Sequence, residues 1–311
     1  MLDAIRAVTL GHAVADALGV PVEFCARKTL KDKPITDMIG YGTYDVPAGT
    51  WSDDTSMSLC ALKSLAKGRV DYNDIMNNFC KWYYNDEFTA TGELFDIGIT
   101  CSQAIDNYCN YSCTTEQCGL SSITSNGNGS LMRIYPFVLY AYFNNIEGKE
   151  LIDIISKASA LTHAHIYSID GCIIYTHILM ELLKKQCKES VHIGLAKAVK
   201  DIKSHDVYKN LLSDNFIKSN EDNIKSSGYI VDTLEASVWC LLTTDNYKDC
   251  VLKAVNLGGD TDTIAAIAGS LVGALYGINN IPKEWLKMLK KEKYIESMCE
   301  NAYNTWRENI E

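Results

Sequence analysis

Two clusters of oxygen-bearing side chains, far apart in the sequence, are the residues best suited to chemistry. The first reads Ser-Asp-Asp-Thr over residues 52–55, and the second reads Asp-Thr-Asp-Thr over residues 260–263. At the start of a helix such residues cap free N–H groups, but one aspartate satisfies that need. Several carboxylates packed this closely repel one another unless a cation lies between them, and hard oxygen ligands suit Mg²⁺, Mn²⁺ or Ca²⁺. The clusters therefore predict a divalent-cation site, with helix capping as the alternative.

Glycines stand before both clusters and strengthen this prediction. Gly49 precedes the first cluster, and Gly258 and Gly259 precede the second, so the backbone can turn and aim the carboxylates inward. The second cluster resembles the Asp-x-Asp-x-Thr nucleophile motif of haloacid-dehalogenase-type phosphatases, but that motif ends a hydrophobic strand, whereas glycines precede it here. Residue 57 is Met, so the first cluster lacks the Asp-Asp-x-x-Asp motif of the all-α prenyl synthases.

The elements that position these clusters are predicted to be helices, and we expect an all-α fold. Apolar residues recur at three- and four-residue steps, which is the period of an amphipathic helix, and sustained strand-like alternation is absent. Asp96 and the sequence Asp-Thr-Leu-Glu at 232–235 are predicted helix starts, and Gly68 is a predicted stop. The periodic segments contain Leu59, Leu62, Leu65 and Ala66; Ile75, Phe79, Trp82 and Tyr83; Leu179, Leu182 and Leu183; and Val238, Leu241 and Leu242.

Length and composition are typical of one globular domain over residues 1–311. The 311 residues are 47% hydrophobic and 22% charged, and no Pro- or Ser-rich linker divides them. Lys and Arg total 29 against 39 Asp and Glu, and the net charge of -10 disfavours a nucleic acid as the main partner. The longest apolar run, 264–278, is shorter than the roughly 20 residues that a bilayer requires, so we expect a core helix and no membrane partner.

The N-terminal residues and the cysteines predict a cytoplasmic protein. The N-terminus lacks a basic leader and carries Asp3 and Asp16 where a signal peptide is neutral or apolar. The 12 cysteines are scattered along the chain without a Cys-x-x-Cys pair. The cluster Cys109, Cys113 and Cys118 has neither a nearby histidine nor a second half at zinc-ligand spacing. We therefore expect free thiols and no zinc site.

Two polar stretches, 109–130 and 213–228, are predicted loops. The first ends in an Asn-Gly turn, which we place at the start of a helix, where backbone N–H groups and the helix dipole can bind a pyrophosphate. The alternative is a simple turn between helices. Arg133, just beyond it, either adds positive charge or faces solvent. The candidate substrate-binding residues of this turn are Asn126, Gly127, Asn128, Gly129 and Ser130.

Five segments of the chain together resemble the ADP-ribosylglycohydrolase family, which includes the dinitrogenase-reductase-activating glycohydrolases. They occur in the family's order and span nearly the whole chain. The combination of Asp-Asp-Thr with Gly-Gly-Asp-Thr-Asp-Thr is specific, whereas any one segment alone is a weak signal. The segments are residues 11–24, which contain Val22-Glu23-Phe24, and residues 49–57, 126–133, 162–165 and 257–263.

This resemblance implies an all-α domain with a binuclear Mg²⁺ or Mn²⁺ centre that removes ADP-ribose from a modified side chain. Glu23 matches the family's acidic residue near the metals, and Asp96 resembles an aspartate of the arginine-directed members; either is a candidate catalytic base. Ser52 stands where the family often has Thr and retains the hydroxyl. The implied metal ligands are Ser52, Asp53, Asp54, Asp260, Asp262 and Thr263.

Three further residues each have a functional and a structural interpretation. The resemblance favours substrate contact by His163, whereas the alternative is hydrogen bonding beside a helix cap. Tyr229 is placed either to stack on adenine or to anchor a lid on the core. Asp16 orients metal ligands or caps and pairs locally.

The leading hypothesis is a metal-dependent hydrolase that cleaves the N-glycosidic bond between ADP-ribose and arginine in an ADP-ribosylated protein. The arginine preference rests mainly on Asp96. The alternatives are hydrolysis of ADP-ribosyl-serine or O-acetyl-ADP-ribose, and a non-catalytic relative that binds ADP-ribose. Every implied metal-ligand position carries an oxygen side chain, which favours the enzyme.

Overall fold

The computed structural model describes residues 1–307, and helices account for all of its regular secondary structure over that range. The predicted all-α fold is confirmed. The α-helices are α1 (Leu2–Gly19), α2 (Arg27–Asp32), α3 (Asp53–Leu65), α4 (Tyr72–Asn85), α5 (Ile99–Cys109), α6 (Tyr135–Phe143), α7 (Gly148–Ala160), α8 (Ile166–Lys184), α9 (Glu189–Ala198), α10 (Ile230–Leu242), α11 (Tyr247–Asn256), α12 (Thr261–Tyr276), α13 (Lys283–Met288) and α14 (Glu292–Trp306). Short 3₁₀ helices are η1 (Val20–Val22), η2 (Gly42–Tyr44), η3 (Phe216–Lys218), η4 (Glu221–Asn223) and η5 (Ile278–Asn280).

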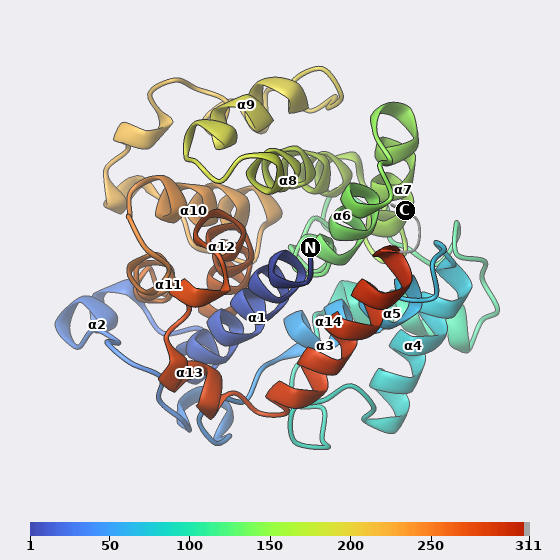
Figure 1. Cartoon of the computed structure of the whole chain (residues 1–311), viewed down its shortest axis with the longest axis horizontal. Helices are drawn as coiled ribbons and strands as arrows, with labels where there is room; N and C mark the ends of the chain where they lie inside the picture. Colours follow the sequence, from blue (N-terminus) through green and yellow to red (C-terminus); the bar gives the residue numbers. More distant parts are fainter. Residues whose placement is uncertain (308–311) are drawn as a thin grey trace.

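Helices α1 and α12 lie side by side at the centre of the molecule, with α10, α11 and α14 around them (Figure 1). Both are buried along almost their whole length, so their small residues decide how closely they pack. A Cβ atom on Gly269 would lie 2.3 Å from the carbonyl oxygen of Gly11, and one on Gly273 would lie 2.1 Å from that of Ala7. Glycine is therefore required on α12, and the close packing sets the end of α1 against the start of α12.

The periodic segments and both acidic clusters occupy the predicted elements. Residues 59–65 lie in α3, 75–83 in α4, 179–183 in α8 and 238–242 in α10. Ser52 is the N-cap of α3 and Asp260 is the N-cap of α12, so each acidic cluster opens a helix as expected.

Three predicted helix boundaries are wrong, because local hydrogen bonds differ from those that the sequence patterns suggest. Helix α5 begins at Ile99 with Gly98 as its N-cap, so Asp96 lies in the preceding loop rather than at the cap. Helix α10 begins at Ile230, so Asp232 lies in its first turn and accepts a hydrogen bond from Ser227 Oγ at 2.6 Å. The turn at 126–130 leads into further turns, and helix α6 begins only at Tyr135.

Two of the cysteines are joined, contrary to the expectation from the sequence. Cys80 of α4 and Cys109 of α5 form a disulfide, so the expectation of free thiols throughout is wrong for this pair. The other cysteines are free.

Helices α1 and α8 are long and apolar enough to cross a bilayer. In the most apolar stretch of each, 94% and 67% of the residues are buried inside the protein, as in core helices of soluble proteins.

Candidate metal and substrate site

A cavity of about 550 Å³ opens where the end of η1, the start of α5, the 124–132 turns and the start of α12 meet. This volume is in the range of small-molecule sites. Four carboxylate residues line it, and they come from four separate segments of the chain: Glu23, Asp53, Asp96 and Asp260. The fold therefore brings the two sequence clusters and both candidate bases to one place.

The first acidic cluster is held by Asp16 of α1. The Asp16 carboxylate accepts hydrogen bonds from the backbone N–H groups of Ser52 and Thr55, at 3.0–3.1 Å, and from Thr55 Oγ1 at 2.6 Å. It thereby caps the start of α3 from outside and leaves the side chains of Asp53 and Asp54 free to face the cavity region. Asp16 therefore caps α3 and fixes the backbone that carries Asp53 and Asp54; its role in orienting metal ligands stays a prediction.

The second cluster is joined to the first. Thr263 Oγ1 donates a hydrogen bond to Asp54 Oδ2 at 3.2 Å, and Ser52 Oγ lies 3.2 Å from the same oxygen. Asp260 Oδ2 accepts a hydrogen bond from Asn128 Nδ2 at 2.8 Å. The start of α12 is fixed against α1 at the same point, because a Cβ atom on Gly19 would lie 2.3 Å from the Cα atom of Asp262.

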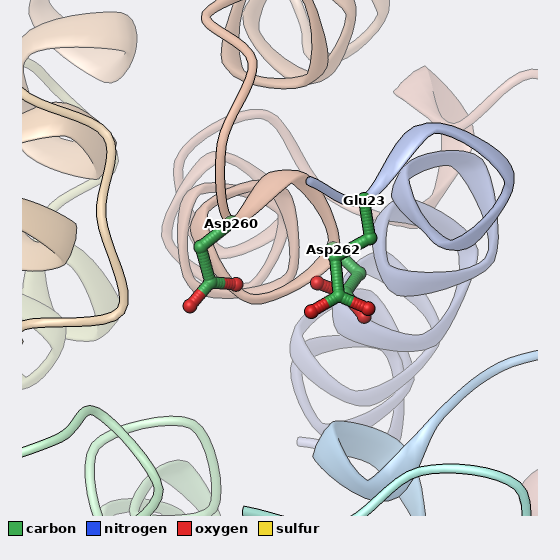
Figure 2. Close-up of side chains that lie close together, drawn as sticks. All are labelled: Glu23, Asp260 and Asp262. Atoms are coloured by element: carbon green, nitrogen blue, oxygen red, sulfur yellow. The ribbon is translucent and has the colours of Figure 1, made fainter. Parts of the chain in front are cut away.

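Glu23, Asp260 and Asp262 are close enough to share one cation. Each offers an oxygen, and these oxygens all lie within 4.8 Å of one another. Figure 2 shows the three side chains pointing to the same side of the N-terminal end of α12. Asp260 Oδ1 and the nearby Asp54 Oδ1 are buried and have no hydrogen-bond partner among residues 1–307. Buried carboxylate oxygens without a partner are costly, so this donor set fits a hard divalent cation.

Burial and mutual repulsion raise the pKa values of six carboxyl groups at this site: Asp16, Glu23, Asp53, Asp54, Asp96 and Asp262. Burial is the largest cause throughout; it raises the pKa of Asp16 to about 6 and, together with the charges of Asp96 and Asp260, that of Glu23 to about 8. The pKa values of Asp53, Asp54 and Asp262 lie well above the ordinary value for the same two reasons, and that of Asp96 is also raised. All the charges that raise these values are other carboxylates, so a bound cation would supply the missing positive charge.

We expect the metal-free protein to lose thermal stability as pH rises from about 5 to about 8. These carboxyl groups hold their protons more tightly when folded than when unfolded, where their pKa values are near 4. The stability that they contribute is therefore present at low pH and is lost as pH rises through the folded-state pKa values of about 6 for Asp16 and about 8 for Glu23. Melting temperatures with EDTA and with Mg²⁺ measured across this range test the prediction, because the gain from Mg²⁺ must grow with pH.

The matched control for this experiment is Asp206→Asn, which removes an exposed carboxylate far from the acidic cluster in sequence and is expected to leave the pH dependence unchanged. A metal-free melting temperature that is highest at pH 8, or a gain from Mg²⁺ that is equal at every pH, would contradict the cation site.

The predicted pyrophosphate turn lies partly in the cavity wall and partly behind it. Gly127, Asn128 and Gly129 line the cavity, and the N–H of Asn128 donates to the carbonyl of Gly228 at 3.0 Å. Asn126 is buried, and its side chain makes hydrogen bonds within the protein. Its Nδ2 donates to the carbonyl of Ile123 at 2.9 Å, and its Oδ1 accepts from Ser168 Oγ at 2.9 Å.

Ser130 is buried in a different set of contacts. Its hydroxyl accepts a hydrogen bond from Ser159 Oγ at 3.0 Å and lies 3.5 Å from Cys172 Sγ. Ser130 and Asn126 therefore hold the turn from behind, while residues 127–129 form its cavity surface.

His163 lines the cavity and is kept neutral. Burial, with the charge of Arg133 as a second cause, lowers the pKa of His163 to about 3. Arg133 is buried rather than solvent-facing, donates to Thr162 Oγ1 at 2.8 Å, and lies over the ring of Phe79. Because Thr162 Oγ1 accepts from Arg133, its own hydrogen can be donated to His163 Nδ1, 2.8 Å away. In the tautomer in which Nδ1 accepts this hydrogen, Nε2 carries the ring proton and can donate it to a ligand.

Tyr229 directly follows the wall residue Gly228 but is not itself among the residues that line the cavity. The residue is 38% exposed, so part of it faces solvent. Gly127 and Tyr229 form an isolated antiparallel β-bridge, in which the Ile230 N–H donates to the backbone carbonyl of Asn126 at 3.0 Å. The second polar loop therefore delivers an exposed aromatic ring beside the Asn-Gly turn.

Some residues of the cavity were not identified from the sequence. Phe24 and Ile99 line it with 70% and 76% of their side chains exposed, and Cys101 lies in the same wall. Tyr44 of η2 donates a hydrogen bond to Glu23 Oε2 at 2.6 Å. Phe24 lies in a segment that carries the family resemblance, but no role was predicted for it; Ile99 and Cys101 of α5 and Tyr44 of η2 are marked by no short motif.

The chain is similar to known proteins over nearly its whole length. The family model described as ADP-ribosylglycohydrolase matches residues 1–311. The chain is 32% identical over 306 residues to the ADP-ribosylarginine hydrolase Tri1 of Serratia proteamaculans, which covers 97% of this chain and 79% of the relative. It is 32% identical over 287 residues to the ADP-ribosyl-dinitrogen reductase glycohydrolase of Rhodospirillum rubrum, over 90% of this chain and 88% of the relative. A solved structure described as an ADP-ribosylglycohydrolase-related protein complex is similar with a TM-score of 0.83 and 29% identity, over 98% of both chains.

Proposed function

The chain belongs to the ADP-ribosylglycohydrolase family, and we propose that it is a metal-dependent hydrolase that removes ADP-ribose from ADP-ribosylated arginine side chains of proteins. The observation that carries the proposal is the convergence of both acidic clusters, Glu23 and Asp96 in one cavity of about 550 Å³. The similarity to proteins named for ADP-ribosylarginine and ADP-ribosyl-dinitrogen reductase supports the substrate class.

We assign the metal site to the two acidic clusters. Six residues of these clusters would hold two Mg²⁺ or Mn²⁺ ions, and Glu23 would share one ion with Asp260 and Asp262. When bound, the ions supply positive charge that orients ribose hydroxyls and lowers the pKa of a bound water. The proposed ligands are Ser52, Asp53, Asp54, Asp260, Asp262 and Thr263.

We assign the rest of the cavity to the nucleotide part of the substrate. The backbone N–H groups of Gly127 and Gly129 and the Nε2–H of His163 are donors suited to the pyrophosphate, and Asn128 links this wall to Asp260. The exposed ring of Tyr229 offers adenine a surface for stacking. The reacting ribose then lies between this wall and the carboxylates.

We assign the role of general base to Asp96. Hydrolysis forms a bond between the water oxygen and the anomeric carbon of the ribose, and breaks the bond from that carbon to the arginine nitrogen. A carboxylate must take the water's proton while the departing guanidine nitrogen gains a proton in exchange, and a base works best with a pKa raised toward the working pH. The pKa of Asp96 is raised by burial, and Asp96 lies in the cavity wall outside the group of three carboxylates that can share a cation. Glu23 belongs to that group, so Asp96 is the carboxylate left for the proton.

Release of free ADP-ribose from arginine- and serine-ADP-ribosylated peptides tests the function. We expect release from the arginine peptide with Mg²⁺ or Mn²⁺, and none with EDTA. Release from the serine peptide or from O-acetyl-ADP-ribose alone would contradict the arginine assignment. Binding of ADP-ribose by calorimetry without any release would mean that the site holds the ligand but does not cut its bond.

A further inference from the structure

Tyr44 contacts Glu23, one of the three carboxylates that can share a cation. Its hydroxyl donates to Glu23 Oε2 at 2.6 Å, and its ring packs against Phe95 with 5.0 Å between centroids. Phe95 directly precedes Asp96 in the chain, so the Tyr44 ring packs against the segment that carries the proposed base. Tyr44 therefore stands between the cation group and the proposed base.

The loop around Tyr44 is fastened to the segment that carries Glu23. Thr43 Oγ1 donates to the backbone carbonyl of Glu23 at 2.7 Å. The Tyr41 N–H donates to the Val46 carbonyl at 2.6 Å and closes the loop on itself. Gly42 has φ +83°, and a Cβ atom there would lie 1.9 Å from the carbonyl oxygen of Pro21, so only glycine fits. These contacts fix the main chain around Tyr44, and the packing of its ring against Phe95 places the hydroxyl beside Glu23.

Backbone bonds hold the main chain of Glu23, but they do not hold its side chain. The Phe24 N–H donates to the Gly259 carbonyl at 2.7 Å, and the Gly259 N–H donates to the Cys25 carbonyl at 2.9 Å. These bonds align the main chain of Glu23 with the start of α12. The carboxylate lies beyond three rotatable bonds and is repelled by the neighbouring carboxylates.

We propose that Tyr44 is a positioning residue for Glu23, whose carboxylate it holds against Asp260 and Asp262 so that the three can bind a divalent cation. The Tyr44 hydroxyl donates its hydrogen bond to Oε2 of Glu23, so Oε1 is the oxygen left for the cation. A hydrogen bond of this kind fixes the orientation of a ligand carboxylate and strengthens metal binding. The inference rests on the metal site of the proposed function but not on the identity of the substrate.

Titration of the metal-free protein with Mn²⁺, followed by electron paramagnetic resonance or calorimetry, tests this role. Tyr44→Phe removes one oxygen and keeps the ring beside Phe95, and we expect Mn²⁺ binding about 10–100-fold weaker than in the wild type. Tyr41→Phe is the matched control, because Tyr41 lies in the same loop with its side chain 61% exposed, and it is expected to bind Mn²⁺ like the wild type.

A double-mutant cycle separates positioning from a general loss of structure. Glu23→Gln alone must weaken Mn²⁺ binding, and adding Tyr44→Phe to it is expected to cause no further loss, because the two residues act as one unit. The melting temperature of metal-free Tyr44→Phe reports its folding independently. Equal Mn²⁺ affinities of wild type and Tyr44→Phe, additive losses in the double variant, or a wild type that does not bind Mn²⁺ would each overturn the proposal. Peptide hydrolysis is measured separately, so a failure of the proposed function is distinguishable from a failure of this inference.

Discussion

Replacing Asp262 with asparagine is expected to lower the rate of ADP-ribose release about 10³-fold or more, because a catalytic cation contributes several kcal/mol to transition-state stabilisation. Asp262 is 1% exposed, and its pKa is raised by burial and by the charges of Glu23, Asp54 and Asp260. It therefore lies at the junction of the two acidic clusters, where one charge affects the whole site. Mn²⁺ binding and ADP-ribose release, measured on the same preparation, check the prediction.

The stability of the metal-free variant distinguishes this loss from misfolding. Asp262→Asn removes one of several repelling carboxylates, so the melting temperature at pH 8 with EDTA should be equal to or higher than that of the wild type. The gain in melting temperature on adding Mg²⁺ should shrink. Asp206→Asn serves again as the control, since its carboxylate is exposed. A variant that keeps both wild-type Mn²⁺ binding and activity would show that Asp262 is not a ligand.

The acidic clusters could be predicted from the sequence because local chemistry sets their position. Ser52 and Asp260 cap helices, and helix capping depends on a few neighbouring residues. The periodic apolar residues likewise predicted the helices, because burial of one face imposes the spacing. The close approach of α1 and α12 depends on facing pairs such as Gly11 and Gly269, which are far apart in the chain. No pattern within either helix predicts that pairing.

Residues placed by loops were harder to predict. Tyr44 meets Glu23 because Gly42 and Thr43 fasten one irregular segment to another, which leaves no periodic signal in the sequence. The Asn-Gly turn has the composition of an anion-binding loop, but Asn126 uses its side chain for internal hydrogen bonds. Composition indicated a turn, and only the fold determines which side of that turn faces the cavity.

Replacing Asp96 with asparagine is expected to lower kcat about 10²- to 10⁴-fold, the range that general-base catalysis contributes. The affinities for Mn²⁺ and for ADP-ribose should stay within a few-fold of the wild type, because Asp96 lies outside the group of carboxylates that can share a cation. Asparagine has nearly the same shape as aspartate, so it leaves the cavity wall intact but cannot accept the proton. Single-turnover release from the arginine peptide, with binding measured in parallel, checks both expectations.

Glu23→Gln provides the comparison that assigns the base. If Glu23 serves the cation site and Asp96 takes the proton, Glu23→Gln loses Mn²⁺ affinity together with activity, whereas Asp96→Asn loses activity alone. The reverse pattern would make Glu23 the base and would place Asp96 at the metal. The geometry favours the first outcome, because Glu23 belongs to the group of three carboxylates that can share a cation, whereas Asp96 lines the cavity outside that group.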